Sequence, residues 1–328
     1  MTLLPSLPRL ARALALGLSA CLPLVAAAQS AERFPSSTVT IVVPFPAGGS
    51  NDVVARLAAQ QLTEAWKVPV VVENKVGAAG NIGADYVAKA APNGHTLMLG
   101  AVSMVTNPSM YKIPAYVPRV LVPVGVGVSV PLVTVARSDL PVKDVASLIA
   151  LAASKAGGLN AASAGSGTLS HLGAELLESD HKAKINHIPY KGSAPALTDV
   201  AGGQADILVD TVASALPMIQ AGKVKAIAVH SPKRQPQLPN VPSYEEQGYK
   251  GLSFAAWNMF VVPEGTPADR IAVLNAALAR VVNDPAIAKS LLDRGIEPFV
   301  MTPAASLDFM RAEAQRWEKV IREKNITQ

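Results

Sequence analysis

Residues 39–62 have the sequence VTIVVPFPAGGSNDVVARLAAQQL, and this stretch contains the elements that decide the fold. Val39–Val43 is a run of β-branched residues typical of a buried strand. From Val53 to Leu62 apolar residues recur at helical spacing, which predicts a helix. The segment between them, residues 44–50, is rich in proline and glycine and predicts a tight loop. A strand, a loop and a helix in this order indicate the start of a parallel α/β sheet.

The same alternation continues along the chain. Strands are predicted at residues 70–72 and 96–99, with a helix at residues 82–90 between them, so the chain begins as a βαβαβ unit. A second series has strands at 132–136, 159–162, 185–188, 207–209 and 224–229, and helices at 145–152, 169–177, 194–200 and 212–220. An apolar run at 254–262 and helices at 267–283, 286–292 and 303–324 close the chain.

Two such series with a helical tail predict two lobes. The tail after Pro263 is too small for a domain of its own, so its simplest packing returns it to the first lobe. The chain then crosses between the lobes twice, along the runs 120–135 and 254–262. We therefore expect one lobe from residues 29–128 and 252–328, and a second lobe from residues 129–251.

The N-terminus has the pattern of a secretory signal at residues 1–28. Arg9 and Arg12 precede an apolar run, and three alanines end it before Gln29. This predicts export to the periplasm. Leu18-Ser19-Ala20-Cys21 also resembles a lipoprotein box, so lipid anchoring at Cys21 is the alternative. Soluble export is favoured because the apolar run continues past Cys21 to Ala28.

Composition excludes several classes of protein. The net charge is +5, and the two leader arginines contribute part of it. No stripe of Lys and Arg is evident, so we expect no nucleic-acid partner. Cys21 is the only cysteine. A mature chain without it has no cysteine nucleophile, thiolate metal site or disulfide.

Four loops at the predicted carboxyl ends of strands are unusual in composition. They are residues 44–50 leading into Asn51 and Asp52, residues 100–103 running on to Asn107, residues 164–168, and residues 190–194. Ligands of open α/β sheets bind at such loops, where helix N-termini present free N–H groups to anions. Each loop alone could be only a tight turn. Together they predict a shared cleft that accepts a carboxylate. Asp52 and Arg56 are four residues apart on the first helix and are expected to pair.

No motif for catalysis, a cofactor or a metal is evident. The nucleotide-binding glycine fingerprints are absent, and Gly125-Val126-Gly127 is interpreted as a hinge or turn. The five histidines show no spacing typical of a metal site. His171 is either a donor to the ligand from a first helical turn or a surface or capping residue. Phe45, Tyr190 and Trp257 are the aromatic residues on candidate loops or crossing strands, with a core role as the alternative.

Several motifs together resemble a known family, the Bug-type receptors of tripartite tricarboxylate transporters. The first loop, from Val42 to Asp52 with Arg56, resembles their signature. Further matches follow in order: VENK at 72–75, GNIG at 80–83, KAAPNG at 89–94, AGSGT at 164–168 with Ser170-His171, PYKG at 189–192, PAL at 195–197, GGQAD at 202–206, SALP at 214–217 and AGK at 221–223. The resemblance covers essentially the whole mature chain.

The resemblance implies a periplasmic-binding-protein type II fold, with two α/β lobes, two crossing strands and a ligand cleft between them. It implies a ligand with a carboxylate: an amino-acid anion, a di- or tricarboxylate, or an aromatic acid. In relatives, backbone groups of the first loop and water molecules hold one carboxylate, and this role carries over to Phe45, Ala47, Gly48 and Ser50. Ser166, Thr168 and Asp210 are implied to shape the other end of the site. With the loop residues predicted above, the candidate ligand-binding set is Phe45, Ala47, Gly48, Gly49, Ser50, Asp52, Ser103, Ala164, Ser166, Gly167, Thr168, Tyr190 and Asp210.

Two features of the sequence bear on the ligand's far end. Asp210 is followed by Thr211-Val212, where relatives often have Asn. Residues 101–105 are apolar around Ser103, which favours a less polar ligand tail.

The implied function is a monomeric receptor that captures a small carboxylate for membrane transporter subunits. One alternative is an orphan sensor that presents the ligand to a signalling protein. An enzyme on the same scaffold is the third reading, but the sequence offers no recognisable nucleophile or acid–base pair. We expect no catalytic residues, no metal and no cofactor.

Overall fold

Of the ten strands in the described residues, nine lie where the apolar runs predict them, and the tenth is an addition near the C-terminus. The structure is a computed structural model that describes residues 34–111 and 120–326. The strands are β1 Val39–Val43, β2 Val70–Asn74, β3 Thr96–Ala101, β4 Leu121–Arg137, β5 Leu159–Ser163, β6 Ile185–Pro189, β7 Ile207–Thr211, β8 Val224–Val229, β9 Ala255–Pro263 and β10 Glu297–Val300. The predicted signal at residues 1–28, with Cys21, lies outside the described residues.

The helices alternate with these strands. They are α1 Ser50–Trp66, α2 Asn81–Ala88, α3 Ser103–Tyr111, α4 Val145–Ser154, α5 Leu169–His181, α6 Ser193–Ala201, α7 Val212–Gln220, α8 Ala268–Asn283, α9 Pro285–Leu292 and α10 Pro303–Glu323, with a short 3₁₀ turn at Ala78–Gly80. No single helix in the described ranges is long and apolar enough to cross a membrane. The pair α8 and α9 meets that test only when taken together across a bend of 68°.

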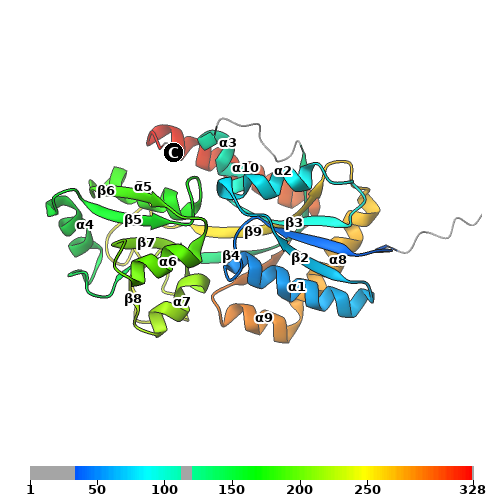
Figure 1. The fold of residues 1–328 in the computed structure, drawn as a ribbon, viewed down its shortest axis with the longest axis horizontal. Coiled ribbons are helices and arrows are strands. Elements are labelled where there is room, and N and C mark those ends of the chain that lie inside the picture. The colour runs from blue at the N-terminus through cyan, green and yellow to red at the C-terminus, as the bar shows by residue number, and fades with distance from the viewer. Residues whose placement is uncertain (1–33, 112–119, 327–328) are drawn as a thin grey trace, which may run out of the picture. The chain divides into compact units, whose positions relative to one another are not determined.

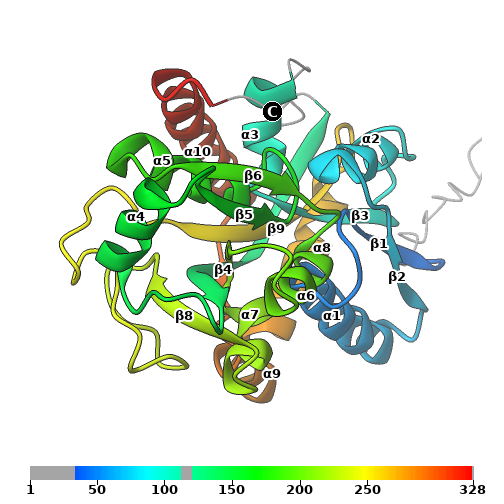
Figure 2. The same ribbon diagram turned by 60° about the vertical axis from the view of Figure 1, so that its left-hand side comes forward.

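The strand β4 links the two halves of the molecule. Along Leu121–Pro131 it pairs with β9, and it also pairs there with β10. Along Leu132–Arg137 it pairs with β7 and β8 instead. The first half is completed by β1 between the parallel strands β2 and β3, and the second by β5 between the parallel strands β6 and β7. Figures 1 and 2 show β4 and β9 running between the green half and the blue and cyan half.

This arrangement is the predicted fold class, two α/β lobes joined by two crossing strands, and the prediction is confirmed. The residue boundaries of the lobes at 128/129 and 251/252 stay a prediction. Residues 34–328 form one compact unit, so the description below concerns that unit alone.

Alternation along the strands covers both faces of the sheet with helices. In β1, Val42 packs in one core cluster with Val87 of α2, whereas Ile41 packs in another with Val54 of α1. Successive side chains of a strand point to opposite faces, and a parallel sheet buried on both faces therefore needs a continuous apolar run. The sequence Val39–Val43 meets this requirement, and four of its five residues are buried.

Three local features differ from the sequence-based expectations. α3 occupies residues that were expected to be a loop, and β10 was not expected. The pair Gly125 and Gly127 lies within β4, where the register with β9 shifts, so the interpretation as a turn is wrong. Gly125 has φ +98°, and a Cβ there would clash with the carbonyl oxygen of Met301. Glycine thus permits a strand irregularity against a neighbouring backbone.

Candidate functional site

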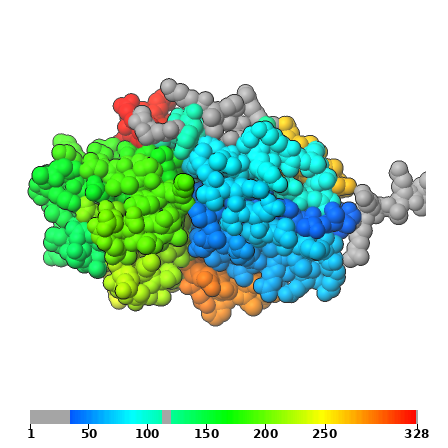
Figure 3. All heavy atoms as spheres, viewed as in Figure 1, coloured from blue at the N-terminus to red at the C-terminus, as the bar shows by residue number. Residues whose placement is uncertain are grey.

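Five of the described helices begin at one cavity between the two halves. The cavity holds about 690 Å³, counted out to its open mouth. Residues at the start of α1, α3, α5, α6 and α7, or just before it, line the cavity. The lining residues are Phe45, Pro46, Ala47, Gly49, Ser50, Asn51, Ala101, Val102, Ser103, Leu132, Ala164, Thr168, Leu169, Ser170, Ser193, Ala194, Asp210, Thr211, Ala256 and Asn258. Figure 3 shows the green atoms of one lobe meeting the blue and cyan atoms of the other along a seam.

The N-terminus of α1 forms one wall of the cavity. Gly49 is its N-cap residue and supplies no side chain to bond the first N–H groups. The first turn of a helix has no intrahelical acceptors for these groups, and it carries a partial positive charge. Ser50 and Asn51 line the cavity at this point. The first turn of α1 is therefore available to an anion in the cavity.

A network behind the first loop fixes its shape. The carboxylate of Asp52 accepts hydrogen bonds from Gly48 N at 3.1 Å, Arg56 Nε at 2.9 Å and Asn74 Nδ2 at 3.1 Å. Asn74 Nδ2 also donates to the carbonyl of Phe45 at 2.9 Å. Burial opposes ionisation of Asp52, but these donors outweigh it and hold its pKa below the usual range. Asp52 thus braces the loop, and the predicted pairing with Arg56 is confirmed.

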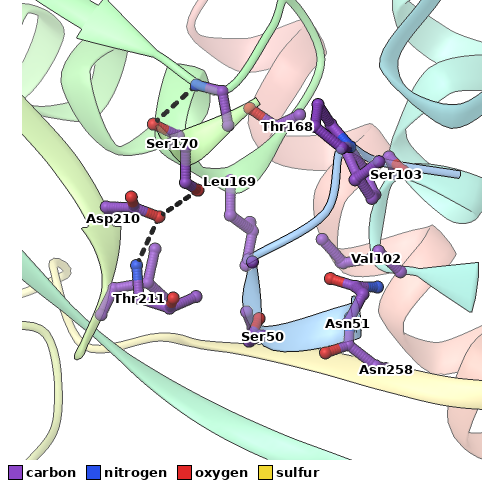
Figure 4. A pocket seen from close by; sticks show the side chains of 18 of the residues that line it. Ser50, Asn51, Val102, Ser103, Thr168, Leu169, Ser170, Asp210, Thr211 and Asn258 are labelled. Carbon is purple, nitrogen blue, oxygen red and sulfur yellow. Dashed lines mark hydrogen bonds between the residues drawn. The ribbon is translucent and has the colours of Figure 1, made fainter. Parts of the chain in front are cut away.

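The third loop is braced in a similar way by buried side chains. Thr168 is the N-cap of α5, and its Oγ1 donates to Gly165 O at 2.7 Å. Ser170 accepts from Ala164 N at 3.2 Å and donates to the carbonyl of Val209 in the neighbouring strand β7. Figure 4 shows Thr168, Leu169 and Ser170 together at this wall of the cavity.

His171 lies behind the third loop, outside the cavity lining. Its side chain is buried at 1% exposure, so the reading as a surface residue is wrong. Nδ1 accepts from Gly167 N at 3.2 Å, and Nε2 lies 3.2 Å from Glu175 Oε1. The ring also stacks on His187 at 3.8 Å. Burial lowers the pKa of His187 to about 4, which keeps that ring neutral at physiological pH.

The starts of α6 and α7 complete the wall from the second lobe. Gly192, the N-cap of α6, has no side-chain cap, and a Cβ on it would lie 2.7 Å from Cδ of Pro46 in the first loop. Ser193 Oγ donates to Asp210 Oδ1 at 2.8 Å, and Thr211 N donates to the same oxygen at 2.7 Å. Burial raises the pKa of Asp210 to about 7 against these two hydrogen bonds.

Eight of the thirteen predicted site residues lie together at the cavity: Phe45, Ala47, Gly49, Ser50, Ser103, Ala164, Thr168 and Asp210. Ser166 and Tyr190 line an adjoining hollow, which shares Phe45 and Ala164 with the main cavity. Gly48 lies at another hollow beside α6. Asp52 and Gly167 make contacts within the protein and do not line the cavity. Asp52 holds the first loop, and the carbonyl of Gly167 accepts from Thr106 Oγ1 at 2.7 Å.

Sequence reasoning missed the part of the lining that lies on the crossing strands. Leu132 of β4 and Ala256 and Asn258 of β9 line the cavity between the loops. The crossing runs were predicted, but no local signal distinguishes a residue that faces a cavity from one in the core. Asn258 offered the one usable signal, because it is a polar side chain within the apolar run of β9. Trp257 beside it is buried, as the core reading expected, and donates to Glu313.

The described residues contain no group of three or more His, Cys, Asp or Glu arranged to hold a metal ion. Asp210 is the one ionisable side chain among the residues that line the cavity. The site therefore combines helix N-termini, hydroxyl and amide groups, and apolar side chains. Such a site between two α/β lobes joined by crossing strands defines the class of the periplasmic-type solute-binding proteins.

The chain belongs to the family described as the tripartite tricarboxylate transporter family receptor, whose model matches residues 54–326. It is 36% identical to Protein BugT of Bordetella pertussis over 91% of this chain and 93% of that protein. It is 34% identical to Rpa4515 of R. palustris, solved with adipate, over 90% of this chain and 100% of that one, with a TM-score of 0.86. MatC from Rhodopseudomonas palustris, solved with bound malate, is 34% identical over 88% of this chain and 100% of that one, with a TM-score of 0.81. The resemblance to Bug-type receptors is confirmed.

Proposed function

We propose that this receptor binds a small carboxylate in the cavity between its lobes, with one carboxylate group at the N-terminus of α1. The observation that carries the proposal is the convergence of five helix N-termini on a cavity whose lining has no Lys, Arg or His side chain. Each such terminus stabilises a nearby anion by about 0.3–1 kcal/mol, and more in partly buried geometry. An anion can thus be bound there without a cation.

The first loop is the strongest candidate for the carboxylate cradle. Gly49 leaves the first N–H groups of α1 without a side-chain cap, and Asp52 holds the loop from behind rather than entering the cavity. A carboxylate in front of Ser50 would accept hydrogen bonds from these N–H groups. Gly48, Phe45 and Ala47 then act by shaping the loop backbone.

The ligands of two relatives support the class of ligand. Adipate is bound to Rpa4515 and malate to MatC, and both are dicarboxylates. In the present chain Ala101, Val102, Leu132 and Leu169 give the cavity an apolar middle. This supports a ligand with a hydrocarbon segment between its polar ends.

The proposal extends to location and partner. The pattern of residues 1–28 supports export to the periplasm with cleavage before Gln29. Membership of the receptor family supports delivery of the ligand to membrane subunits of a tripartite transporter.

Mass spectrometry of protein recovered from the periplasmic fraction should give a chain that begins at Gln29. A lipidated chain that begins at Cys21 would contradict soluble export.

A thermal-shift screen tests the class of ligand. Binding to the native state alone stabilises it by about 2.7 kcal/mol at a ligand concentration of 100 Kd. We therefore expect at least one of malate, succinate, glutarate and adipate to raise Tm by on the order of 5 °C. The matched control is the diamide of the active acid, which has the same shape without charge and should give no shift. If no carboxylate raises Tm, or if the diamide is as effective as the acid, the proposal is wrong.

A further inference from the structure

Two buried oxygens on residues that line the cavity have no hydrogen-bond partner within the described residues. They are Oδ2 of Asp210 on β7 and Oδ1 of Asn258 on β9. Their residues are 3% and 2% exposed. Figure 4 places Asp210 and Asn258 on different sides of the cavity. A buried polar atom left without a partner costs on the order of 1–3 kcal/mol, so both oxygens are candidates for contact with a ligand.

The hydrogen bonds of Asp210 are unevenly divided between its two oxygens. Both donors, Ser193 Oγ and Thr211 N, bond to Oδ1. This division fits a neutral carboxylic acid, in which the carbonyl oxygen accepts and the other oxygen carries the proton. Oδ2 is then the hydroxyl oxygen, which is buried and has no partner among the described residues, on a residue that lines the cavity.

Most of the titratable groups near Asp210 are bound to other partners. On the elements packed against β7, the titratable side chains are Arg137 of β4, His171, Glu175, Glu178, Asp180 and His181 of α5, and Asp199 of α6. Arg137 pairs with Asp206, Glu175 with His171, Asp180 with Lys324 and Asp199 with the hydroxyl of Tyr190. Across the cavity, Asp52 is held by Arg56.

Among the described residues, none contributes a positive charge that affects the pKa of Asp210. Burial is the main cause of its raised pKa of about 7, and the two hydrogen bonds to Oδ1 only partly oppose it. A ligand carboxylate beside Asp210 would raise this pKa further, because two carboxylates that share a site resist double ionisation. A dicarboxylate should thus find Asp210 protonated.

The geometry points to Asp210 as the residue that selects the ligand's second acidic group, by donating a hydrogen bond from a protonated Oδ2 to a ligand carboxylate. The inference rests on the proposed function and deepens it: the site takes a dicarboxylate together with one proton. The proton stays on Asp210 in the complex and is shared across the hydrogen bond. Above pH 7 the free protein has lost this proton, and ligand binding must take one up from solvent.

The test is the pH dependence of affinity, measured by calorimetry from pH 6 to pH 9 with the dicarboxylate that raises Tm most. For the natural chain, affinity should fall about tenfold between pH 8 and pH 9, because one proton is taken up per ligand. At pH 8 the binding enthalpies in Tris and in HEPES should differ by the amount expected for about one proton. Phosphate is avoided because it is itself an anion.

Two variants separate this role from a structural one. In Asp210→Asn the amide oxygen can accept from Ser193 and Thr211, while Nδ2 donates to the ligand without a titrating proton. Its affinity should be nearly constant from pH 6 to pH 9 and should exceed that of the natural chain at pH 9. Ser193→Ala removes a hydrogen bond that lowers the pKa of Asp210, so the decline in affinity should begin at higher pH.

The outcomes are distinct. Dicarboxylate binding with constant affinity across this pH range and no proton uptake would overturn the role of Asp210 and leave the carboxylate receptor intact. A second result would also overturn the role of Asp210: aspartate binds more tightly than succinate, and a proton is released on binding. In that case Asp210 is ionised and contacts the ammonium group of the ligand. Loss of dicarboxylate binding in a folded Asp210→Asn protein at pH 7 would also count against it. If no carboxylate binds at any pH, both proposals fail.

Discussion

Asp52 and Asp210 illustrate how surroundings give two buried carboxyl groups opposite properties. Asp52 accepts from Arg56, Asn74 and Gly48, and its pKa is lowered although burial opposes this. Asp210 has only neutral donors, and burial raises its pKa to about 7. A paired carboxylate therefore stabilises the first loop as an anion, while an unpaired one remains able to carry a proton.

A charge placed at Ser50 tests the cradle at the scale of one residue. In Ser50→Asp a negative charge would stand where we place the ligand carboxylate. Asp is favourable in the first turn of a helix, so we expect the fold to be kept. Repulsion at a distance of about 4 Å is worth several kcal/mol near a protein surface, and affinity for a carboxylate should fall by at least about tenfold.

The matched control is Ser50→Asn, because the Asn side chain has nearly the same size as Asp and carries no charge. Calorimetry on both variants, with Tm as a check on folding, should show a much smaller loss for Asn than for Asp. Equal affinities of the two variants would contradict a carboxylate at the start of α1.

At the scale of elements, the helix starts fall into two kinds. α5 and α7 begin at Thr168 and Thr211, whose side chains cap the first turn. α1 and α6 have glycine N-cap residues with no side-chain cap, and the loops before them lie close together, since a Cβ on Gly192 would meet Pro46. The N-termini of α1 and α6 have backbone N–H groups that a ligand can bond, whereas the N-termini of α5 and α7 place polar side chains at the cavity.

α3 joins the two halves beside the cavity. Tyr111 donates to the carbonyl of Ser166 at 2.7 Å, and Thr106 donates to that of Gly167 at 2.7 Å. Opening of the lobes should break both bonds. In Tyr111→Phe the closed form should lose about 1 kcal/mol, and ligand affinity should fall by up to about fivefold.

Tyr244→Phe is the control for this variant. It removes a buried hydrogen bond of the same length, 2.7 Å to Thr134 Oγ1, which lies within the second lobe. Both variants should lose stability in thermal unfolding, but only Tyr111→Phe should bind ligand more weakly. The account of α3 is wrong if the two variants bind equally well.

The sequence did not indicate α3 for a physical reason. The helix contains Pro108, mixes polar and apolar residues without a clear apolar face, and follows the glycine of the second loop, which suggests a loop rather than an amphipathic helix. Its stability comes from packing against α10, the segment more than 190 residues further on. A local pattern carries no information on such a long-range contact.

At the scale of the whole molecule, the sequence was sufficient for every described strand except β10 and for most of the cavity. β1 and β8 begin and end at the predicted residues, because their apolar runs are bounded by polar or turn residues. All four predicted loops contribute residues to the cavity because carboxyl ends of strands from both lobes converge there. The contribution of β9 through Asn258 depends on how the lobes pack together, which no local motif records.

The same reasoning explains why some residues predicted to contact the ligand do not line the main cavity. Gly48 and Gly167 belong to the right loops, but the backbone turns their neighbours toward the cavity instead. A motif identifies a loop, whereas the side that faces a ligand is set by φ and ψ at each residue, such as φ +90° at Gly48 and φ +87° at Gly167.

The most direct test of the central claim is a crystal structure with the dicarboxylate that raises Tm most. The account predicts one carboxylate of the ligand with its oxygens about 2.7–3.2 Å from backbone nitrogens at the start of α1, near Ser50, in the cavity between the lobes. It also predicts the second carboxylate within the same distance of Asp210 Oδ2. A ligand bound elsewhere, or one whose carboxylates are both held by Lys or Arg side chains, would contradict it.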